Sequence, residues 1–540
     1  MMRVRGHRDR WVPGRDARAV RHPPPTPDSA GRLDRQPTAV VVGGGIAGLA
    51  AATGLAERGV AVTLVEAAPT LGGRVRAWPV QADGSATTMS RGFHAFFRQY
   101  YNLRALLRRT DPTLSRLRAV RDYPLVLAGG HTDSFAGLPT RPPLNLMAFV
   151  ARSPTFTLRD LARVNADAAL ALLDVSFPRT YEDYAGRSAA EVLDKLRFPD
   201  GARHLALEVF ARSFFADPRE FSGGELVAMF HTYFLGSAEG LLFDVPYDDY
   251  DTALWAPLGR HLESLGVRVV MPVKATALED RRERVGVGLE DGATVEADVV
   301  VLATDQEPLQ GLVASAEWLG NEPWRMRVAE RRTAPAFAVW RLWFDRPVRE
   351  GTPPFLATSG FGPLDNVSAV HRFEAGAARW ARTRRGSVVE LHAYALPDGT
   401  DEAALRVELR NQLRELHPEL DRATVVHEEW LVRDDCPLIG TEPWADRPEV
   451  RTPDLRVTLA GDGIRCDYPV ALMERAATTG WMAANAHLAR WGLRGHELWT
   501  VPMDGRHRVV PRLRKLGMTP GWKAGERGQA PKSSPRARSR

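Results

Sequence analysis

The sequence predicts an α/β protein in which a parallel, dinucleotide-binding sheet is interrupted by a mixed α+β domain. Three observations lead to this prediction. A short apolar strand at 39–42 runs into a glycine-rich turn and an alanine-rich helix. Two further apolar runs, within 292–304 and at 455–460, have the composition of buried parallel strands. Because these segments lie far apart in the chain, we expect the sheet to be assembled from separate stretches with other structure inserted between them.

The turn after the first strand carries the spacing G-x-G-x-x-G at Gly43, Gly45 and Gly48. Each glycine has a physical role in a dinucleotide site. The first allows a tight turn, the second lets the backbone approach a pyrophosphate, and the third lets helix and strand pack closely. This pattern alone is weak evidence, but here it stands between a strand and a helix in the required order.

The helix that follows begins with Ile46 and Ala47 as its first two residues and ends before Gly59. A second apolar strand covers 61–65. The N-terminus of a helix offers unpaired N–H groups and a partial positive charge to phosphates. Glu66 ends the second strand, where its carboxylate can accept hydrogen bonds from ribose hydroxyls. An acid at this position favours FAD or NAD over NADP, whose additional phosphate it would repel.

A second turn follows Glu66 as E-x5-GGR, with Gly72, Gly73 and Arg74. It resembles the segment of the amine oxidase and carotene desaturase group of flavoproteins that lies over the FAD diphosphate. The resemblance implies a GR2-type, Rossmann-like FAD-binding domain, in which glycine N–H groups and an arginine cation bind phosphate. NAD dehydrogenases lack this turn, so we expect FAD.

Two later segments are similar to FAD-binding elements of the same group. A strand within 292–304 ends at Thr304, and the strand at 455–460 is followed by Gly461 and Asp462. The resemblance implies that Asp462 meets the ribityl chain or the pyrophosphate, and it adds Val273, Thr304 and Val470 as cofactor-binding positions. A helix expected at 471–489 would direct its N-terminus at the flavin.

The most distinctive stretch is Arg91–Leu103, RGFHAFFRQYYNL. It resembles a segment of plant-type phytoene and ζ-carotene desaturases and, most closely, of the actinobacterial isorenieratene synthases, a family of β-carotene desaturase/methyltransferases. One departure is Arg98, because plant desaturases usually have glycine after the paired phenylalanines. An arginine facing the substrate would add charge to the pocket.

The resemblance implies a hydrophobic carotenoid substrate and a reaction in which a β-ionone ring is desaturated while a methyl group shifts from C1 to C2. Such a site must exclude water and place a base near the ring cation. His94 is the first candidate for the base. Asp249, within the acidic stretch 244–251, is the second, with a solvated loop as the alternative. Trp340–Phe344 is either a pocket wall or ordinary sheet packing.

Other functions stay open. They are linear carotene desaturation, carotene isomerisation, amine oxidation, or carotenoid binding without catalysis. Quinone and oxygen are both open as electron acceptors. A metal site at His427–Glu429 is rejected, because no second histidine follows four residues later.

Composition limits location and partners. Only two cysteines occur, Cys436 and Cys466, so we expect no disulfide framework. Without a secretory signal or a long apolar run, we expect a cytoplasmic protein. The net charge is +6, yet residues 1–36 carry +5 and residues 501–540 carry +9, which leaves the body at −8.

The two basic ends are rich in Pro, Gly, Ser and Arg, so we expect them to be disordered and dispensable. Attraction to anionic lipids at the inner face of the membrane is the functional alternative. A nucleic-acid partner is not expected, because no binding motif accompanies the charge. The helix expected within 142–175 is either buried or a contact with the bilayer.

These inferences divide the chain into an FAD-binding domain in three parts, two substrate-domain segments and two tails. The expected FAD-binding parts are 37–140, 251–310 and 451–500. A mainly helical substrate segment is expected at 141–250 and one with a β-sheet at 311–450, with tails at 1–36 and 501–540.

Overall fold

The computed structural model describes residues 16–26, 35–154, 164–197 and 214–506. Its centre is a five-stranded sheet in the order β11-β3-β2-β15-β21, with every neighbouring pair parallel. The strands are β2 (Thr38–Val42), β3 (Ala61–Val65), β11 (Arg268–Val270), β15 (Val299–Leu302) and β21 (Val457–Leu459). The central strands are apolar and almost fully buried, as strands covered on both faces must be. The α/β fold with a sheet built from distant segments is confirmed.

Two long helices pack against each other beside this sheet, α1 (Ile46–Ala56) and α15 (Leu472–Arg490). Small residues permit the close approach. A Cβ on Gly480 would lie 2.2 Å from the carbonyl oxygen of Ala47, and a Cβ on Gly54 would lie 2.9 Å from the Ala484 Cβ. The contact therefore fixes the start of α1 relative to α15.

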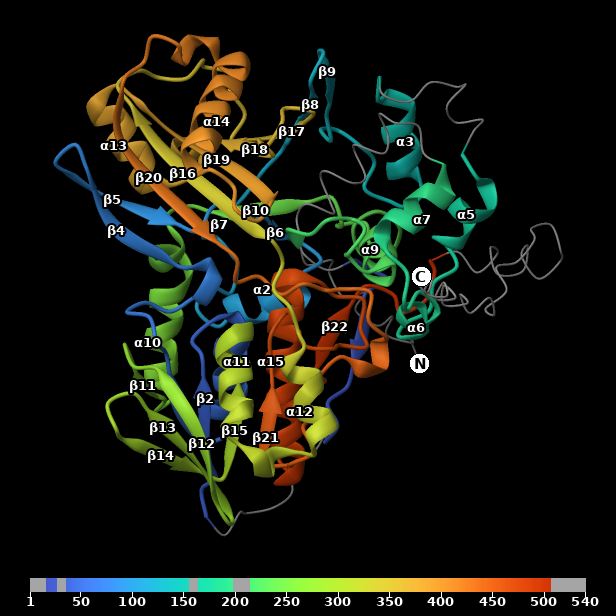
Figure 1. The fold of residues 1–540 in the computed structure, drawn as a ribbon, viewed down its shortest axis with the longest axis vertical. Coiled ribbons are helices and arrows are strands. Elements are labelled where there is room, and N and C mark those ends of the chain that lie inside the picture. The colour runs from blue at the N-terminus through green and yellow to red at the C-terminus, as the bar shows by residue number, and fades with distance from the viewer. Residues whose placement is uncertain (1–15, 27–34, 155–163, 198–213, 507–540) are drawn as a thin grey trace, which may run out of the picture.

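A seven-stranded sheet forms the second layer of the molecule, in the order β20-β16-β19-β18-β17-β8-β9. Figure 1 shows it above the parallel sheet, with α13 and α14 on its outer side. Its elements are β8 (Leu125–Leu127), β9 (His131–Asp133), β16 (Ala336–Phe344), β17 (Phe355–Ser359), β18 (Asn366–Ser368), β19 (Ser387–Leu396), β20 (Val425–Arg433), α13 (Ala375–Arg384) and α14 (Glu402–Leu416). Strands β8 and β9 belong to this sheet although they lie within 37–140, so the expected boundary at residue 140 is too late.

The aromatic run of β16 packs inside this layer. Trp340 and Phe344 join the core cluster that contains the buried leucines of α14, and Trp343 packs with the buried face of α13. Sheet packing, rather than a pocket wall, is the role of this run.

The remaining elements are smaller. Helices are α2 (Tyr101–Leu107), α3 (Leu144–Arg152), α5 (Ala166–Ala171), α6 (Arg179–Asp183), α7 (Ala189–Leu196), α9 (Gly223–Met229), α10 (Ala256–Ser264), α11 (Gln306–Ala314) and α12 (Glu322–Ala329). Strands are β4 (Ala77–Ala82), β5 (Ser85–Ser90), β6 (Phe96–Phe97), β7 (Leu117–Ala119), β10 (Phe243–Pro246), β12 (Ala275–Arg281), β13 (Arg284–Leu289) and β14 (Thr294–Ala297). No helix in the described part of the chain is both long and apolar enough to cross a membrane.

Part of the expected N-terminal tail is ordered, which corrects the prediction for residues 16–26. Strand β1 (Val20–His22) pairs antiparallel with β22 (Leu498–Thr500). The buried carboxylate of Asp16 accepts a hydrogen bond from Arg506 at 2.8 Å and another from the Ala238 N–H at 2.6 Å. Backbone pairing and a buried ion pair outweigh the polar composition here. Residues 501–506 of the expected C-terminal tail are ordered as well, and the predictions for 1–15, 27–34 and 507–540 lie outside the described residues.

Candidate functional site

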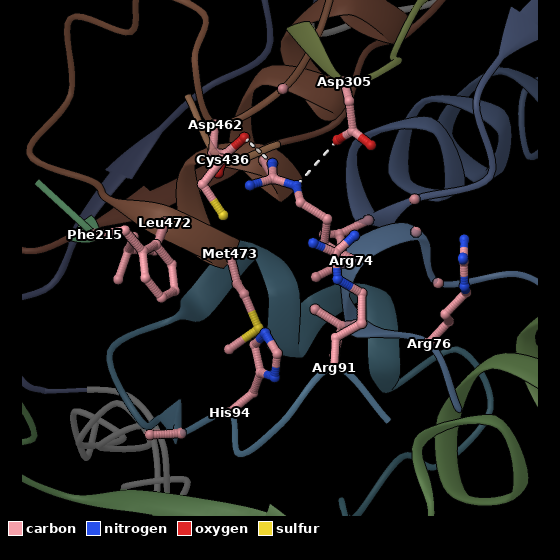
Figure 2. A pocket seen from close by; sticks show the side chains of 18 of the residues that line it. Arg74, Arg76, Arg91, His94, Phe215, Asp305, Cys436, Asp462, Leu472 and Met473 are labelled. Carbon is pink, nitrogen blue, oxygen red and sulfur yellow. Dashed lines mark hydrogen bonds and ion pairs between the residues drawn. The ribbon is translucent and has the colours of Figure 1, made fainter. Parts of the chain in front are cut away.

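A cavity of about 420 Å³ lies between the parallel sheet and the seven-stranded sheet. Its size is within the range of cofactor and ligand sites. One half is lined by backbone and charged groups of the glycine turns, and the other half by aromatic side chains. Figure 2 shows part of the lining around Arg74. The cavity therefore combines a polar end with an apolar end.

The glycine turns form the floor of the polar end, where side chains would not fit. Gly43 has a φ of +108°, and a Cβ on it would lie 2.3 Å from the Ala303 carbonyl oxygen. A Cβ on Gly48 would lie 1.8 Å from the Gly43 carbonyl oxygen. A Cβ on Gly72 would meet the Trp255 indole at 2.4 Å. The predicted glycines thus shape the floor, and those that line the cavity are Gly43, Gly45, Gly72 and Gly73.

Glu66 fixes the first glycine turn to the end of β3, and the two glycine turns meet where the Gly72 N–H donates to the Gly44 carbonyl at 2.8 Å. One carboxylate oxygen accepts from the Gly44 N–H at 2.5 Å and the other from the Ala68 N–H at 2.7 Å. Burial raises the pKa of Glu66, and these two N–H donors oppose that rise. The carboxylate lines the cavity as well as holding its wall. Its position fits hydrogen bonding to a ribose.

Helix α1 opens onto the same end of the cavity. Gly45 is its N-cap and supplies no side-chain acceptor, so the N–H groups at the start of the helix lie available to a ligand at Ile46 and Ala47. This arrangement is suited to an anion such as a diphosphate. With the glycine floor and Glu66, it fits the dinucleotide FAD.

Arg74 is not the cation available to phosphate that the sequence predicted. Its guanidinium lies 2.5 Å from Asp462 and 3.0 Å from Asp305, as Figure 2 shows. Two carboxylates therefore neutralise it, so phosphate binding depends on backbone N–H groups and on other cations. The cations that sequence reasoning missed are Arg76 and Lys274, which also line the cavity. Neither has a carboxylate within ion-pair distance among the described residues.

Other predicted cofactor positions separate into two groups. Thr304, Gly461 and Asp462 line the cavity. Val273 and Val470 do not. The Val273 N–H donates to the Glu66 carbonyl at 2.9 Å, and the Val470 carbonyl accepts from Arg475 at 2.7 Å. These two valines support the wall from outside the cavity.

His94 lines the cavity, as the sequence predicted for a base. Its Nδ1 lies 2.9 Å from the Gly92 carbonyl oxygen, so Nδ1 carries the proton and Nε2 is the acceptor. Burial lowers its pKa to about 4, which keeps the ring neutral near pH 7. Among the described residues Nε2 has no hydrogen-bond partner, so its lone pair is available to a ligand.

Asp249 is withdrawn as a catalytic candidate. It does not line the main cavity, and one of its oxygens accepts from the N–H groups of Asp251 and Thr252 at 3.0 Å each. The expectation of a solvated acidic loop is also wrong. Asp244, buried in the same stretch, pairs with Arg98 at 3.2 Å and with Arg104. Arg98 is thereby held outside the cavity.

Neither cysteine has the environment of a reactive thiol. Cys466 is 1% exposed, and its sulfur lies 3.8 Å from that of Met482, as expected for a packed thiol. Cys436 lines the cavity, but burial raises the pKa of its thiol to about 11. Both are protonated thiols at neutral pH.

The apolar half of the cavity is built from aromatic rings contributed by several elements. Phe93 stacks on Phe355 with ring centroids 4.4 Å apart, and Phe97 meets Tyr233 edge-on at 4.7 Å. The aromatic side chains that line it are Phe93, Phe97, Tyr100, Tyr123, Phe215, Tyr233, Phe243, Phe337, Phe355 and Tyr394. Such a wall recognises an extended apolar ligand and offers π faces to a cation.

Two polar residues of β19 that sequence reasoning missed also line the cavity. They are His392 and Tyr394. A signal for them was available. Within the apolar run of β19, Glu390, His392 and Tyr394 follow each other at intervals of two, which places their side chains on one face of the strand.

Comparison with known proteins identifies the family. The model described as flavin containing amine oxidoreductase matches residues 46–488. The chain belongs to this family. With the cavity geometry, this makes the protein an FAD-dependent oxidoreductase. The expectation of FAD as cofactor is confirmed.

Relatives are found among carotenoid enzymes. The chain is 55% identical to the carotenoid phi-ring synthase of Streptomyces griseus, over 95% of this chain and 98% of that protein. It is 27% identical to the carotenoid phi-ring synthase of Chlorobaculum tepidum, over 88% and 92%. It is similar at 25% identity to a zeta-carotene desaturase of Synechocystis, over 83% and 96%.

A putrescine oxidase variant superposes on the chain with a TM-score of 0.62 at 18% identity, covering 84% of this chain and 99% of that one. At this level of identity the similarity shows the fold.

Proposed function

We propose that the protein acts on a carotenoid and converts a β-ionone ring to an aromatic ring, with migration of a methyl group from C1 to C2, as isorenieratene synthases do. The observation that carries this proposal is the 55% identity, over nearly the whole of both chains, to a carotenoid phi-ring synthase. The aromatic half of the cavity supports it, because a carotene has no polar group and is recognised through apolar contacts.

FAD, when bound at the glycine floor, supplies the acceptor for the hydride that a desaturation removes. The protein's own residues then have three tasks. The aromatic walls exclude water, which would otherwise trap the ring cation. Their π faces stabilise its charge. The Nε2 of His94 accepts a proton that the cation releases, and a pKa of about 4 suffices because carbocations are far stronger acids.

Packed aromatic rings connect the cavity wall to a helix whose apolar side chains are exposed. From the cavity, Tyr123 stacks on Phe135 at 4.6 Å, and Phe135 stacks on Phe149 at 4.9 Å. Phe149 belongs to α3, whose Leu144 and Met147 are 55% and 63% exposed. We therefore propose that α3 rests on the bilayer surface, from which the carotene enters.

Pigment analysis of a β-carotene-accumulating bacterium that expresses the protein tests the function. An aromatic carotenoid with the same number of carbons and fewer hydrogens is the expected product. Unchanged β-carotene would overturn the proposal. Linear carotene desaturation, favoured by the similarity to zeta-carotene desaturase, would then be tested with acyclic carotenes.

The role of His94 is tested with His94→Gln, which keeps a polar side chain and removes the basic nitrogen. We expect FAD content to stay at the wild-type level while aromatic product falls about a hundredfold or more. His261→Gln is the matched control, because His261 lies on α10 and does not line the cavity. Wild-type product from His94→Gln would exclude His94 as a base.

A further inference from the structure

Glu390, His392 and Tyr394 of β19 form a hydrogen-bonded row beside the cavity. The role proposed for His94 does not involve these residues. The Tyr394 hydroxyl lies 2.8 Å from the Nδ1 of His392, and the Nε2 of His392 lies 2.8 Å from Glu390. Both Tyr394 and His392 line the cavity, whereas the buried Glu390 does not. The row therefore leads from the cavity surface into the protein.

An arginine holds the inner end of this row. Arg341 lies opposite Glu390 in the register of β16 and β19, and its guanidinium is 2.7 Å from the Glu390 carboxylate. Burial alone would raise the pKa of Glu390, but Arg341 and the hydrogen bond from His392 together outweigh it and hold the value at about 2. Glu390 is therefore ionised, and both of its oxygens can only accept hydrogen bonds.

The direction of the hydrogen bonds follows from that ionisation. Because Glu390 accepts, the Nε2 of His392 donates, and in the neutral imidazole Nδ1 is then the acceptor for the proton of the Tyr394 hydroxyl. The Phe93 N–H lies 3.4 Å from the same Nε2, but it forms no hydrogen bond with a nitrogen that itself donates to Glu390. Asn366 donates to the Tyr394 oxygen at 2.9 Å, which fixes the hydroxyl in place.

The row lies next to His94. Gly92 has a φ of +99°, and a Cβ on it would lie 2.4 Å from the His392 ring. The carbonyl of the same glycine accepts the Nδ1–H of His94 at 2.9 Å. Gly92 therefore binds His94 through its carbonyl and packs against His392. The two proton acceptors, His94 and the row on β19, face the same cavity.

We propose that Tyr394, His392 and Glu390 form a second proton relay of the active site. This inference rests on the proposed function, because aromatising one β-ionone ring removes two hydrides and two protons. In the relay step a C–H bond of the ring cation breaks, and its electron pair becomes a C=C bond. The proton goes to the Tyr394 oxygen while the phenol's own proton passes to His392 Nδ1. The step needs no oxidant.

Glu390 stabilises the imidazolium that this step forms, and Arg341 fixes Glu390. Tyr394 is the residue that would touch the substrate, whereas Glu390 acts through His392 as a positioning residue. His94 accepts one of the two protons and the relay accepts the other.

Tyr394→Phe tests the relay, because it keeps the ring that packs edge-on against Phe215 at 4.8 Å and removes only the hydroxyl. His392→Asn keeps a hydrogen-bond acceptor and removes the basic nitrogen. Tyr181→Phe is the matched control, since it deletes a buried hydroxyl that binds the Tyr468 carbonyl at 3.1 Å outside the cavity. FAD content, β-carotene consumption and aromatic product are measured for each full-length holoenzyme.

We expect Tyr394→Phe and His392→Asn each to lower aromatic product about a hundredfold while FAD stays bound. The double variant should be no slower than the slower single variant, because both act in one unit. Product formation by the wild type should slow in D₂O, since the phenol proton exchanges with solvent, and Tyr394→Phe should lose this effect.

Wild-type product from Tyr394→Phe, multiplying effects in the double variant, or loss of FAD from Tyr394→Phe would each overturn the relay. A wild-type protein that leaves β-carotene unconsumed would instead refute the proposed function. The two failures are therefore distinguishable.

Discussion

Replacing Glu66 with glutamine should weaken FAD binding without unfolding the protein. The carboxylate accepts the Gly44 N–H at 2.5 Å and the Ala68 N–H at 2.7 Å. A glutamine of the same size has one acceptor oxygen, so it can satisfy only one of these donors and turns an NH₂ group toward the other. The first glycine turn is then no longer held against the end of β3 in the geometry that binds the dinucleotide.

The magnitude follows from the bond that is lost. A hydrogen bond to a charged group contributes about 1.5–3 kcal/mol, which corresponds to FAD binding weaker by roughly tenfold to 150-fold. Glu66→Arg removes both acceptors and adds a bulky cation, so it should abolish binding.

Titration of the apoprotein with FAD, followed by the quenching of flavin fluorescence, gives the dissociation constant. Glu263→Gln on α10 is the control, because it makes the same substitution at an exposed carboxylate. A dissociation constant of Glu66→Gln equal to that of the control would refute the reasoning. Stoichiometric FAD retained by Glu66→Arg would refute the assignment of the ribose site.

The other predictions concern backbone, pH and membrane. Gly92→Ala should destabilise the protein by about 1–2 kcal/mol, because the positive φ of Gly92 is unfavourable for alanine, and should displace His392. Denaturant unfolding measures the loss of stability. Unchanged stability and activity would contradict this prediction. Burial lowers the pKa of His231 to about 4, against 6.5 in the unfolded chain. The unfolded state therefore binds more protons between these values, and the contribution of His231 to stability should fall by up to about 3 kcal/mol as pH drops from 6.5 to 4. His231→Gln should flatten that part of the profile, and an unaltered profile would exclude the histidine as its cause. Met147→Glu should reduce flotation with liposomes, with Glu263→Gln as control, and equal flotation would argue against α3 as the contact.

The parts of the fold that could be predicted are those encoded within one short stretch. The strand at 38–42, the start of the helix at Ile46 and the turn at Gly72 depend on neighbours in sequence. The pairing of Arg74 could not be predicted in this way. Its partners Asp305 and Asp462 come from other parts of the chain, and only the folded sheet brings them to one place.

The same reasoning explains the errors at the substrate end. The acids around Asp249 have the composition of a solvated loop, yet tertiary contacts with Arg98 and Arg104 bury their neighbour Asp244. His392 and Tyr394 lie at the end of the site that no glycine-rich motif marks. The signal there was polar residues at intervals of two within a buried strand.

The order of strands in the parallel sheet has a consequence for how the protein is made. The central strand β2 lies at 38–42, but its neighbour β15 lies at 299–302 and β21 at 457–459. The cavity wall also includes Ala476. A chain emerging from the ribosome therefore has no complete cofactor site until almost all of the described residues have been synthesised. Until then, the unpaired strand edges are open to aggregation. FAD then stabilises only the finished fold by mass action, so flavin supply should govern the yield of folded protein at the end of synthesis.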